Sequence, residues 1–133
     1  MTKGTIPKPT DAELAILRVL WRQGPSTVRQ VHEVLCRRRQ LAYTTTLKLL
    51  QIMTEKGLTS REEQGSQHLY RPRHAEDEMQ RRLVGELLER AFGGSTSKLV
   101  MQALAAKRAS PEELREIRRL LAARKERKEK GHD

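Results

Sequence analysis

The side chains best suited to covalent or metal chemistry are few in this chain, and their spacing does not favour such chemistry. The four histidines, His32, His68, His74 and His132, show no ligand spacing with a carboxylate pair or a cysteine. Cys36 is the single cysteine and lies at a basic helix end without an obvious base, so packing is a better interpretation than a nucleophile. It can form neither an internal disulfide nor a thiolate cluster. We therefore expect no enzyme, no metal site and no cofactor.

Hydroxyl and basic side chains favour a different chemistry, contact with nucleic acid, because they can bond phosphates or base edges. They gather on one side of a predicted helix over residues 43–56, at steps of three and four: Thr44, Thr45, Lys48, Gln51 and Glu55. The predicted DNA-binding residues are Tyr43, Thr44, Thr45, Thr46 and Lys48 in this helix, and Arg61, His68 and Arg71 after it. A solvated face of an ordinary helix, and for His68 a plain strand histidine, stay open as alternatives.

The charge of the chain also favours a polyanionic partner. Lys and Arg outnumber Asp and Glu by 27 to 17, for a net charge of +10. Residues 1–73 carry 13 basic and 6 acidic residues, whereas residues 74–133 carry 14 and 11. The basic first part is therefore the expected DNA-binding part. Its run Arg37-Arg38-Arg39 fits a phosphate clamp or a solvated charged turn.

The elements that must position these residues are three helices and a hairpin. The first helix begins with the capping box of Thr10 and Glu13 and ends at Gly24-Pro25. Glu13 is also expected to face outward. Ser26 or Thr27 caps the second helix, and Gly57 ends the third. Two short strands, 58–62 and 67–71, follow around a turn. This order is typical of a winged helix, in which the third helix enters the major groove and the hairpin lies against the DNA backbone.

The sequence of residues 74–133 predicts a helical domain that packs against another surface. Three short amphipathic helices begin near Glu76, Ser95 and Ser110 and cannot enclose a good core alone. They either fold back on the first domain or pair with a second copy, and we favour pairing. The residues expected in the dimer interface are apolar and share helical faces: Met79, Leu83, Leu87, Leu99, Leu104, Leu114, Ile117 and Leu121.

The fold class is accordingly predicted to be mainly α with a small β-hairpin. We expect a winged helix-turn-helix DNA-binding domain over residues 1–73, a helical dimerisation domain over 74–127 and a disordered charged tail over 128–133. The sequence has no apolar run of about 18 residues and no hydrophobic core in residues 1–10 typical of a secretory signal. A cytoplasmic protein without direct membrane insertion is expected. A winged helix used as a protein-binding adaptor is the remaining alternative.

Several segments resemble the penicillinase-repressor family, the BlaI/MecI/CopY-type regulators, over about residues 7–127: TDAEL (10–14), VLW (19–21), VRQV (28–31), LAYTT (41–45), EKGL (55–58) and HLYRP (68–72). The resemblance implies a winged-helix N-terminal domain, a helical dimerisation domain and repression by a homodimer on palindromic double-stranded operator DNA. Resistance or stress genes and the repressor's own gene are the implied targets. A membrane sensor or protease system is a further partner that the resemblance allows.

Two positions depart from the pattern of this family. Ile52 stands where relatives often carry arginine, so a phosphate or surface contact is missing there. Antibiotic-responsive members are inactivated by cleavage of an Asn-Phe bond, where this chain has Gln102-Ala103. The resemblance therefore does not predict cleavage at that bond, and a different cleavage site stays open. The copper-responsive branch is less similar, because it relies on C-terminal cysteines that this chain lacks.

Overall fold

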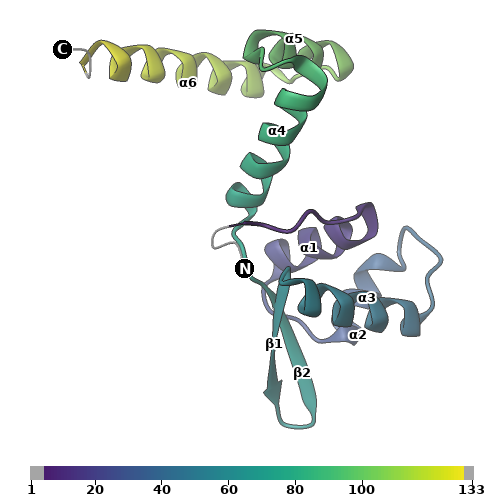
Figure 1. Cartoon of the computed structure of the whole chain (residues 1–133). Coiled ribbons are helices and arrows are strands. Elements are labelled where there is room, and N and C mark those ends of the chain that lie inside the picture. Colours follow the sequence, from purple (N-terminus) through teal and green to yellow (C-terminus); the bar gives the residue numbers. More distant parts are fainter. Residues whose placement is uncertain (1–4, 131–133) are drawn as a thin grey trace. The chain divides into compact units, whose positions relative to one another are not determined.

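The structure is a computed structural model that describes the backbone of residues 5–130 and the side chains of residues 5–127. Six helices and one hairpin follow one another along the chain (Figure 1): α1 (Asp11–Gln23), α2 (Val28–Leu35), α3 (Tyr43–Lys56), β1 (Thr59–Gln64), β2 (Gln67–Pro72), α4 (Glu76–Phe92), α5 (Thr96–Ala106) and α6 (Pro111–Lys130). The chain divides into two compact units, one up to Glu86 and one from Leu87. The division falls inside α4, thirteen residues beyond the expected boundary after residue 73.

The start of α1 follows from its capping residues. The Thr10 side chain accepts a hydrogen bond from the Glu13 amide, and the Glu13 carboxylate accepts one from the Thr10 amide at 2.9 Å. These two bonds satisfy N–H groups that a helix start leaves without partners. Gly24 ends the helix with a backbone φ of 86°. The capping box and the end of this helix are confirmed.

The second and third helices form the helix-turn-helix. Thr27 caps α2 by accepting from the amide of Gln30, and Ser26 is left outside the helix. The backbone of Ser26 instead pairs with Tyr70 in both directions, at 3.0 and 2.8 Å, and so forms an isolated β-bridge beside β2. Gly57 ends α3 in the left-handed region with a φ of 89°, as the sequence predicts.

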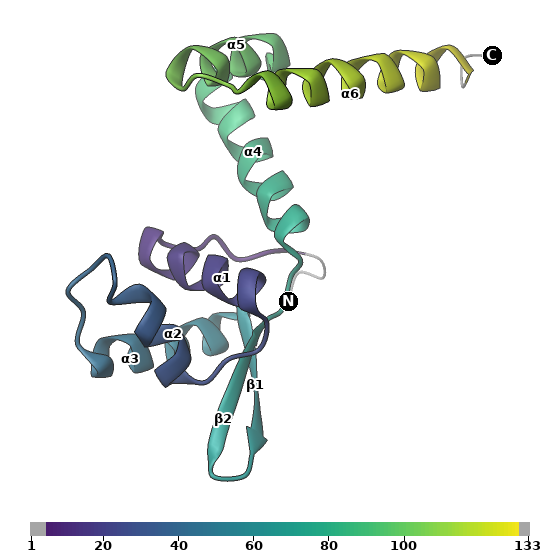
Figure 2. The same ribbon diagram turned by 180° about the vertical axis from the view of Figure 1, so that it is seen from behind.

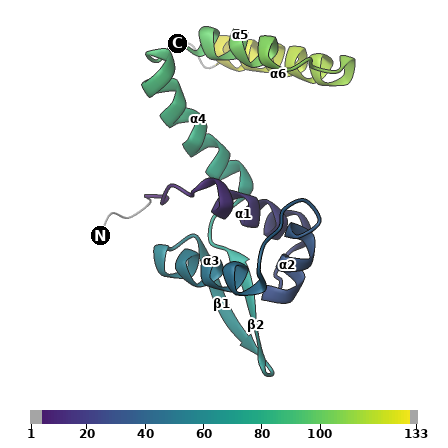
Figure 3. The ribbon, with the colours of Figure 1, turned by 90° about the vertical axis from the view of Figure 1, so that its right-hand side faces the viewer.

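The hairpin is antiparallel and pairs Thr59 with Pro72 at its base and Gln64 with Gln67 at its tip. Its tip extends away from the helices (Figure 2), and its base lies beside α3 (Figure 3). α1, α2 and α3 pack on one another, β1 packs on α3, and β2 packs on α1 and α2. The arrangement is the predicted winged helix.

The core of the first unit is mainly aliphatic, as the scarcity of aromatic residues requires. Its fully buried members come from all three helices and the hairpin, and include Ile16, Leu17, Leu20, Val31, Leu50, Met53, Leu58 and Tyr70. One charged side chain joins them. Glu13 is only 2% exposed and forms an ion pair with Lys56 Nζ at 2.7 Å. The expectation that Glu13 faces outward is therefore wrong, because a lysine of α3 meets it across the helix interface.

The first half of α4 belongs to the first unit. Met79 is 1% exposed and lies in the core of that unit, and Leu83 packs against the same core. The Trp21 indole N–H donates to the His74 carbonyl at 3.0 Å, and Lys8 pairs with Glu86 at 2.9 Å. The assignment of Met79 to a dimer interface is therefore corrected: this side chain is already covered by its own chain.

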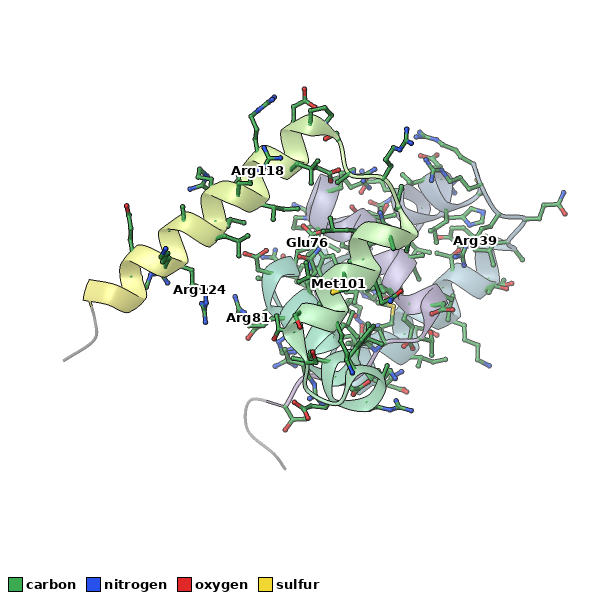
Figure 4. The ribbon with its side chains drawn as sticks, turned by 90° about the horizontal axis from the view of Figure 1, so that it is seen from above. Arg39, Glu76, Arg81, Met101, Arg118 and Arg124 are labelled. Atoms are coloured by element: carbon green, nitrogen blue, oxygen red, sulfur yellow. The ribbon has the colours of Figure 1, made fainter. Side chains whose placement is uncertain are left out.

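The second unit lacks such a core. None of the described side chains from Leu87 to Arg127 is buried. Several large apolar residues are instead exposed: Leu87, Val100, Met101, Leu104, Leu120 and Leu121. Figure 4 shows side chains along α5 and α6, with Met101, Arg118 and Arg124 labelled. Within the unit, Ser95 caps α5, and Ser110 forms a capping box with Glu113 at the start of α6.

The structure near the end of the chain differs from the disordered tail that the sequence predicts. α6 continues to Lys130, so residues 128–130 are helical where the sequence predicts a disordered tail. Its sequence after Arg124 has charged residues in steps that a helix tolerates, even without an apolar anchor. The remaining tail residues 131–133, with His132, lie outside the described residues. Among the described helices, none has both the length and the apolar character needed to cross a bilayer.

Candidate nucleic-acid interface

One face of α3 is polar and open to solvent. Tyr43, Thr44, Thr45 and Lys48 are all exposed, while Leu50 and Met53 on the other side have no exposed surface. The helix is thus fixed by its apolar side, and the opposite side presents two threonine hydroxyls, a phenol and an ammonium group. Such a face can donate to phosphates and base edges without disturbing the core.

Thr46 does not belong to this face. Its side chain is fully buried, and its hydroxyl lies 3.0 Å from His32 Nδ1. It joins α3 to α2, so the prediction that its side chain contacts DNA is wrong. The sequence could have indicated that Thr46 is buried, because positions 46, 50 and 53 are four and three residues apart and therefore lie on the same side of the helix.

The Tyr43 ring lies between two side chains of α2. The His32 ring meets it edge-on with centroids 5.6 Å apart, and the Arg29 guanidinium lies 6.0 Å from its centroid. The ring is still 42% exposed. At the same end of α3 the N-cap residue is Ala42, which supplies no side-chain hydrogen bond to the first turn. The start of α3 therefore combines uncapped amide groups with an arginine held over an aromatic ring, both of which favour an anion.

The hairpin carries balanced charge. Arg61 is exposed, whereas Arg71 pairs with Glu62 across the two strands and His68 Nε2 lies 3.7 Å from Glu63. β1 and β2 together hold two arginines and two glutamates. Both pairs are solvent-exposed, so each is worth little and can exchange for a phosphate contact. The predicted residues on α3 and on the hairpin lie in the same unit, which contains β1 packed on α3.

Comparison with known proteins identifies this arrangement. Residues 9–123 match the family model of the penicillinase repressor. The chain belongs to the penicillinase repressor family. Membership confirms the resemblance noted in the sequence and shows a DNA-binding transcriptional regulator, not an enzyme.

Two relatives are similar to this chain over most of its length. The transcriptional regulator BlaI of Mycobacterium tuberculosis is 37% identical over 113 residues, which cover 84% of this chain and 81% of that protein. The penicillinase repressor of Bacillus licheniformis is 25% identical over 123 residues, which cover 92% of this chain and 96% of that protein. In both cases the similarity extends into the second unit.

Solved structures support the fold of the first unit. The solution structure of the DNA-binding domain of the repressor BlaI matches with a TM-score of 0.50 and 24% identity, covering 56% of this chain and 90% of that domain. The monomeric form of Bacillus licheniformis BlaI, solved in complex with the blaP half-operator, matches with the same values. Together with the helices and hairpin described above, these matches confirm the winged-helix fold class.

The Glu13–Lys56 pair is the main buried electrostatic feature of this family member. Burial alone raises the pKa of the Glu13 carboxyl, but hydrogen bonds from Lys56 and from the Thr10 amide outweigh it, and the pKa is lowered overall. The pair joins the start of α1 to the end of α3. It therefore fixes the position of the helix that presents the polar face.

Two contacts at this interface could not be predicted from the sequence. The contact of Arg29 with Tyr43 joins residues fourteen positions apart, and no spacing rule links them. The same holds for His32 and Thr46. Among the described residues, no group of three His, Cys, Asp or Glu side chains comes together in a way that could hold a metal ion.

Proposed function

We propose that the chain represses transcription as a homodimer on palindromic operator DNA, with α3 of each copy in the major groove and the hairpin beside the backbone. The observation that carries this proposal is the exposed polar face of α3, set on a helix whose other side is fully buried. The order of three helices and a hairpin supports the same docking geometry. The BlaI monomer solved with a half-operator supports one DNA-binding unit per half-site.

The proposed contacts fall into two sets. Thr44, Thr45 and Lys48, which are exposed on α3, would meet base edges and phosphates in the groove. Arg61, His68 and Arg71, which lie on the hairpin, would meet the flanking backbone. Phosphate contacts fix orientation, whereas base contacts carry sequence discrimination.

Dimerisation through the second unit is supported by its open apolar surface. Leu87, Leu104 and Leu121 are between 41% and 64% exposed, so covering the rest of each side chain would contribute about 1 kcal/mol, roughly half the value of full burial. A second copy of the same surface is self-complementary by symmetry and suits a two-fold operator. Leu99, Leu114 and Ile117, which are half-buried, belong to the same proposed interface.

The proposed targets are resistance or stress genes and the gene of the repressor itself. Footprinting on the DNA upstream of that gene tests this part directly. A protected sequence with two-fold symmetry is the expected result. Protection of no discrete sequence would contradict it.

Salt dependence tests DNA binding as opposed to a protein-binding adaptor. If about five phosphates are neutralised, the logarithm of the binding constant should fall against the logarithm of salt concentration with a slope of about −4.5. Fluorescence anisotropy with a footprinted duplex and an unrelated duplex of equal length measures this slope and the discrimination. A flat dependence, or equal affinity for both duplexes, would contradict operator recognition.

A further inference from the structure

The positive charge of the first unit is concentrated around α2 and the start of α3. Residues 28–48 hold five basic residues and one acidic residue, whereas β1 and β2 hold two of each. β1 and β2 therefore add no net charge, and Arg71 already pairs with the carboxylate of Glu62. An electrostatic attraction to DNA must come mainly from the region before and within α3.

Four arginines account for most of that charge. Arg29 lies on α2, and Arg37, Arg38 and Arg39 form the turn that follows it. All four are exposed, and within the described part of the chain none of them forms an ion pair. Glu33 is the one acidic residue in the same stretch. A phosphate can therefore reach these guanidinium groups without displacing a carboxylate.

The turn that carries three of them is ordered by backbone hydrogen bonds. The amide of Arg37 donates to the Val34 carbonyl at 3.3 Å, and the amides of Arg38 and Arg39 donate to the Leu35 carbonyl at 3.2 and 3.1 Å. The turn thus follows α2 directly and is held by the carbonyls of its last two residues. Arg39, labelled in Figure 4, extends from it. Its Cα lies at most about 14 Å from that of Tyr43, because Tyr43 is only four positions further along the chain.

The fourth arginine is held by an aromatic ring at the start of α3. The guanidinium of Arg29 lies 6.0 Å from the centroid of Tyr43, and the edge of His32 fixes that ring from a second side. Tyr43 begins the helix whose polar face is open. Arg29 is consequently fixed beside the groove-facing end of α3, at the edge of a groove about 12 Å wide whose borders are phosphates.

We propose that Arg29 and Arg37–Arg39 bind the phosphate backbone of the operator at the edge of the major groove entered by α3, and that Tyr43 positions Arg29. This inference rests on the proposed function and adds a second backbone contact to the one proposed for the hairpin. Arginine suits this task because its planar group bonds phosphate in a bidentate manner. Such contacts raise affinity for any sequence and fix the position of α3 in the groove.

The turn is tested by removing two charges in the full-length chain. Arg38→Gln with Arg39→Gln is compared with a control that removes two exposed arginines of α1, Arg18→Gln with Arg22→Gln. The salt slope of the turn variant should be less steep by about 1.8 for each DNA-binding unit, at about 0.9 per phosphate contact. The footprinted and the unrelated duplex should lose affinity by similar factors. An unchanged slope, or an equal change in the control, would overturn the inference.

The role of Tyr43 is tested by keeping or removing its ring. Tyr43→Phe keeps the face that holds Arg29 and should keep the salt slope of the original chain, because the lost hydroxyl is uncharged. Tyr43→Ala and Arg29→Gln should each flatten the slope, and the double variant should lose no more than either single change. Equal losses for Tyr43→Phe and Tyr43→Ala would show that the hydroxyl contacts DNA directly. Additive losses would show that Tyr43 and Arg29 act separately.

The same measurements separate this inference from the proposed function. If the original chain binds both duplexes equally, operator recognition fails, and the slopes still decide whether the arginines meet phosphates. If the original chain prefers the footprinted duplex but the arginine variants keep its slope, only the inference fails. Thermal melts of each variant show whether a loss of affinity reflects unfolding.

Discussion

Three consecutive threonines show how position decides the role of a residue. Thr44 and Thr45 are exposed on the polar face of α3, while Thr46 is fully buried against His32. Their chemistry is identical, so the 100° turn between neighbours in a helix alone separates solvent from core. Substitutions at these sites should therefore affect different properties of the protein.

Thr45→Ala or Lys48→Ala should weaken operator binding about tenfold or more, because a good base or phosphate contact is worth about 1–3 kcal/mol. Both side chains are exposed, so the thermal melt should stay nearly unchanged. Anisotropy titrations and melts on the same samples check this. Full binding by both variants would show that the groove-facing surface has been assigned wrongly.

Thr46→Val should instead lower the stability of the protein. It removes the hydroxyl that lies 3.0 Å from His32 Nδ1 while nearly preserving the side-chain volume. A loss of about 1 kcal/mol is expected, since a part-buried imidazole is left without its partner. Denaturant unfolding measures it, with Thr44→Val at the exposed site as the control. A larger loss in the control would contradict the assignment.

Glu13 makes stability depend on pH in the acid range. The pKa of its carboxyl is lowered in the folded protein, so the stabilisation is present above the unfolded pKa of about 4.3 and is lost as pH falls through the lower folded value. Compared with Glu13→Gln, the original chain should be more stable by about 1–2 kcal/mol near pH 7, because Lys56 is partly exposed. Unfolding curves between pH 3 and 7 should converge at the acid end. A constant difference across this range would assign the effect to packing.

At the scale of elements, local chemistry predicted the helix starts well. Thr10, Thr27 and Ser110 open helices with capping residues that act within three positions, and Gly57 ends α3 as expected. The sequence also placed the polar face of α3, because helical periodicity is local. Contacts across the chain were not accessible in this way. The ion pair of Glu13 with Lys56 spans 43 residues, and no periodicity within one helix shows what faces it.

Met79 is the clearest case of such a missed contact. Its spacing with Leu83 and Leu87 predicts one continuous stripe along α4, but the stripe is divided: Met79 is buried in the first unit, and Leu87 is exposed in the second. An apolar stripe indicates that a helix face is covered, but it does not identify the surface that covers it.

Met79→Ala should therefore destabilise the first unit, by about 2–5 kcal/mol as for other large-to-small core changes. The proposed dimer should persist where the protein remains folded. Met79→Leu, which nearly preserves volume, serves as the control and should cost less than about 1.5 kcal/mol. Unfolding curves and sedimentation together check this. Dissociation without loss of stability would return Met79 to the dimer interface.

At the scale of the whole molecule, the two units differ in how they bury apolar surface. The first encloses a core within its own chain, and the second exposes leucines on α4, α5 and α6. Sequence reasoning predicted this difference from the shortness of the three helices, but placed the boundary earlier in the chain. Contacts of Trp21 and Lys8 with the start of α4 move it to Glu86.

Leu87→Asp or Leu114→Asp should yield monomers, because a carboxylate placed in an apolar interface loses its hydration. Affinity for the full operator should fall with it. Sedimentation at micromolar concentration measures the mass, and Leu87→Met provides an apolar control. Variants that remain dimeric would show that the second unit packs in another way.

Because α4 begins in the first unit and ends in the second, it affects how the proposed dimer would dissociate from its operator. Because Met79 and the contacts around it fasten the start of α4 to the first unit, loss of the chain beyond Glu86 would leave each DNA-binding unit intact. In the proposed dimer, one bound unit keeps the other near its half-site at an effective concentration in the millimolar range. If the two DNA-binding units were separated, this avidity would be lost, and each unit would bind its half-site independently and more weakly. Occupancy would then collapse while every DNA-contacting side chain stays in place.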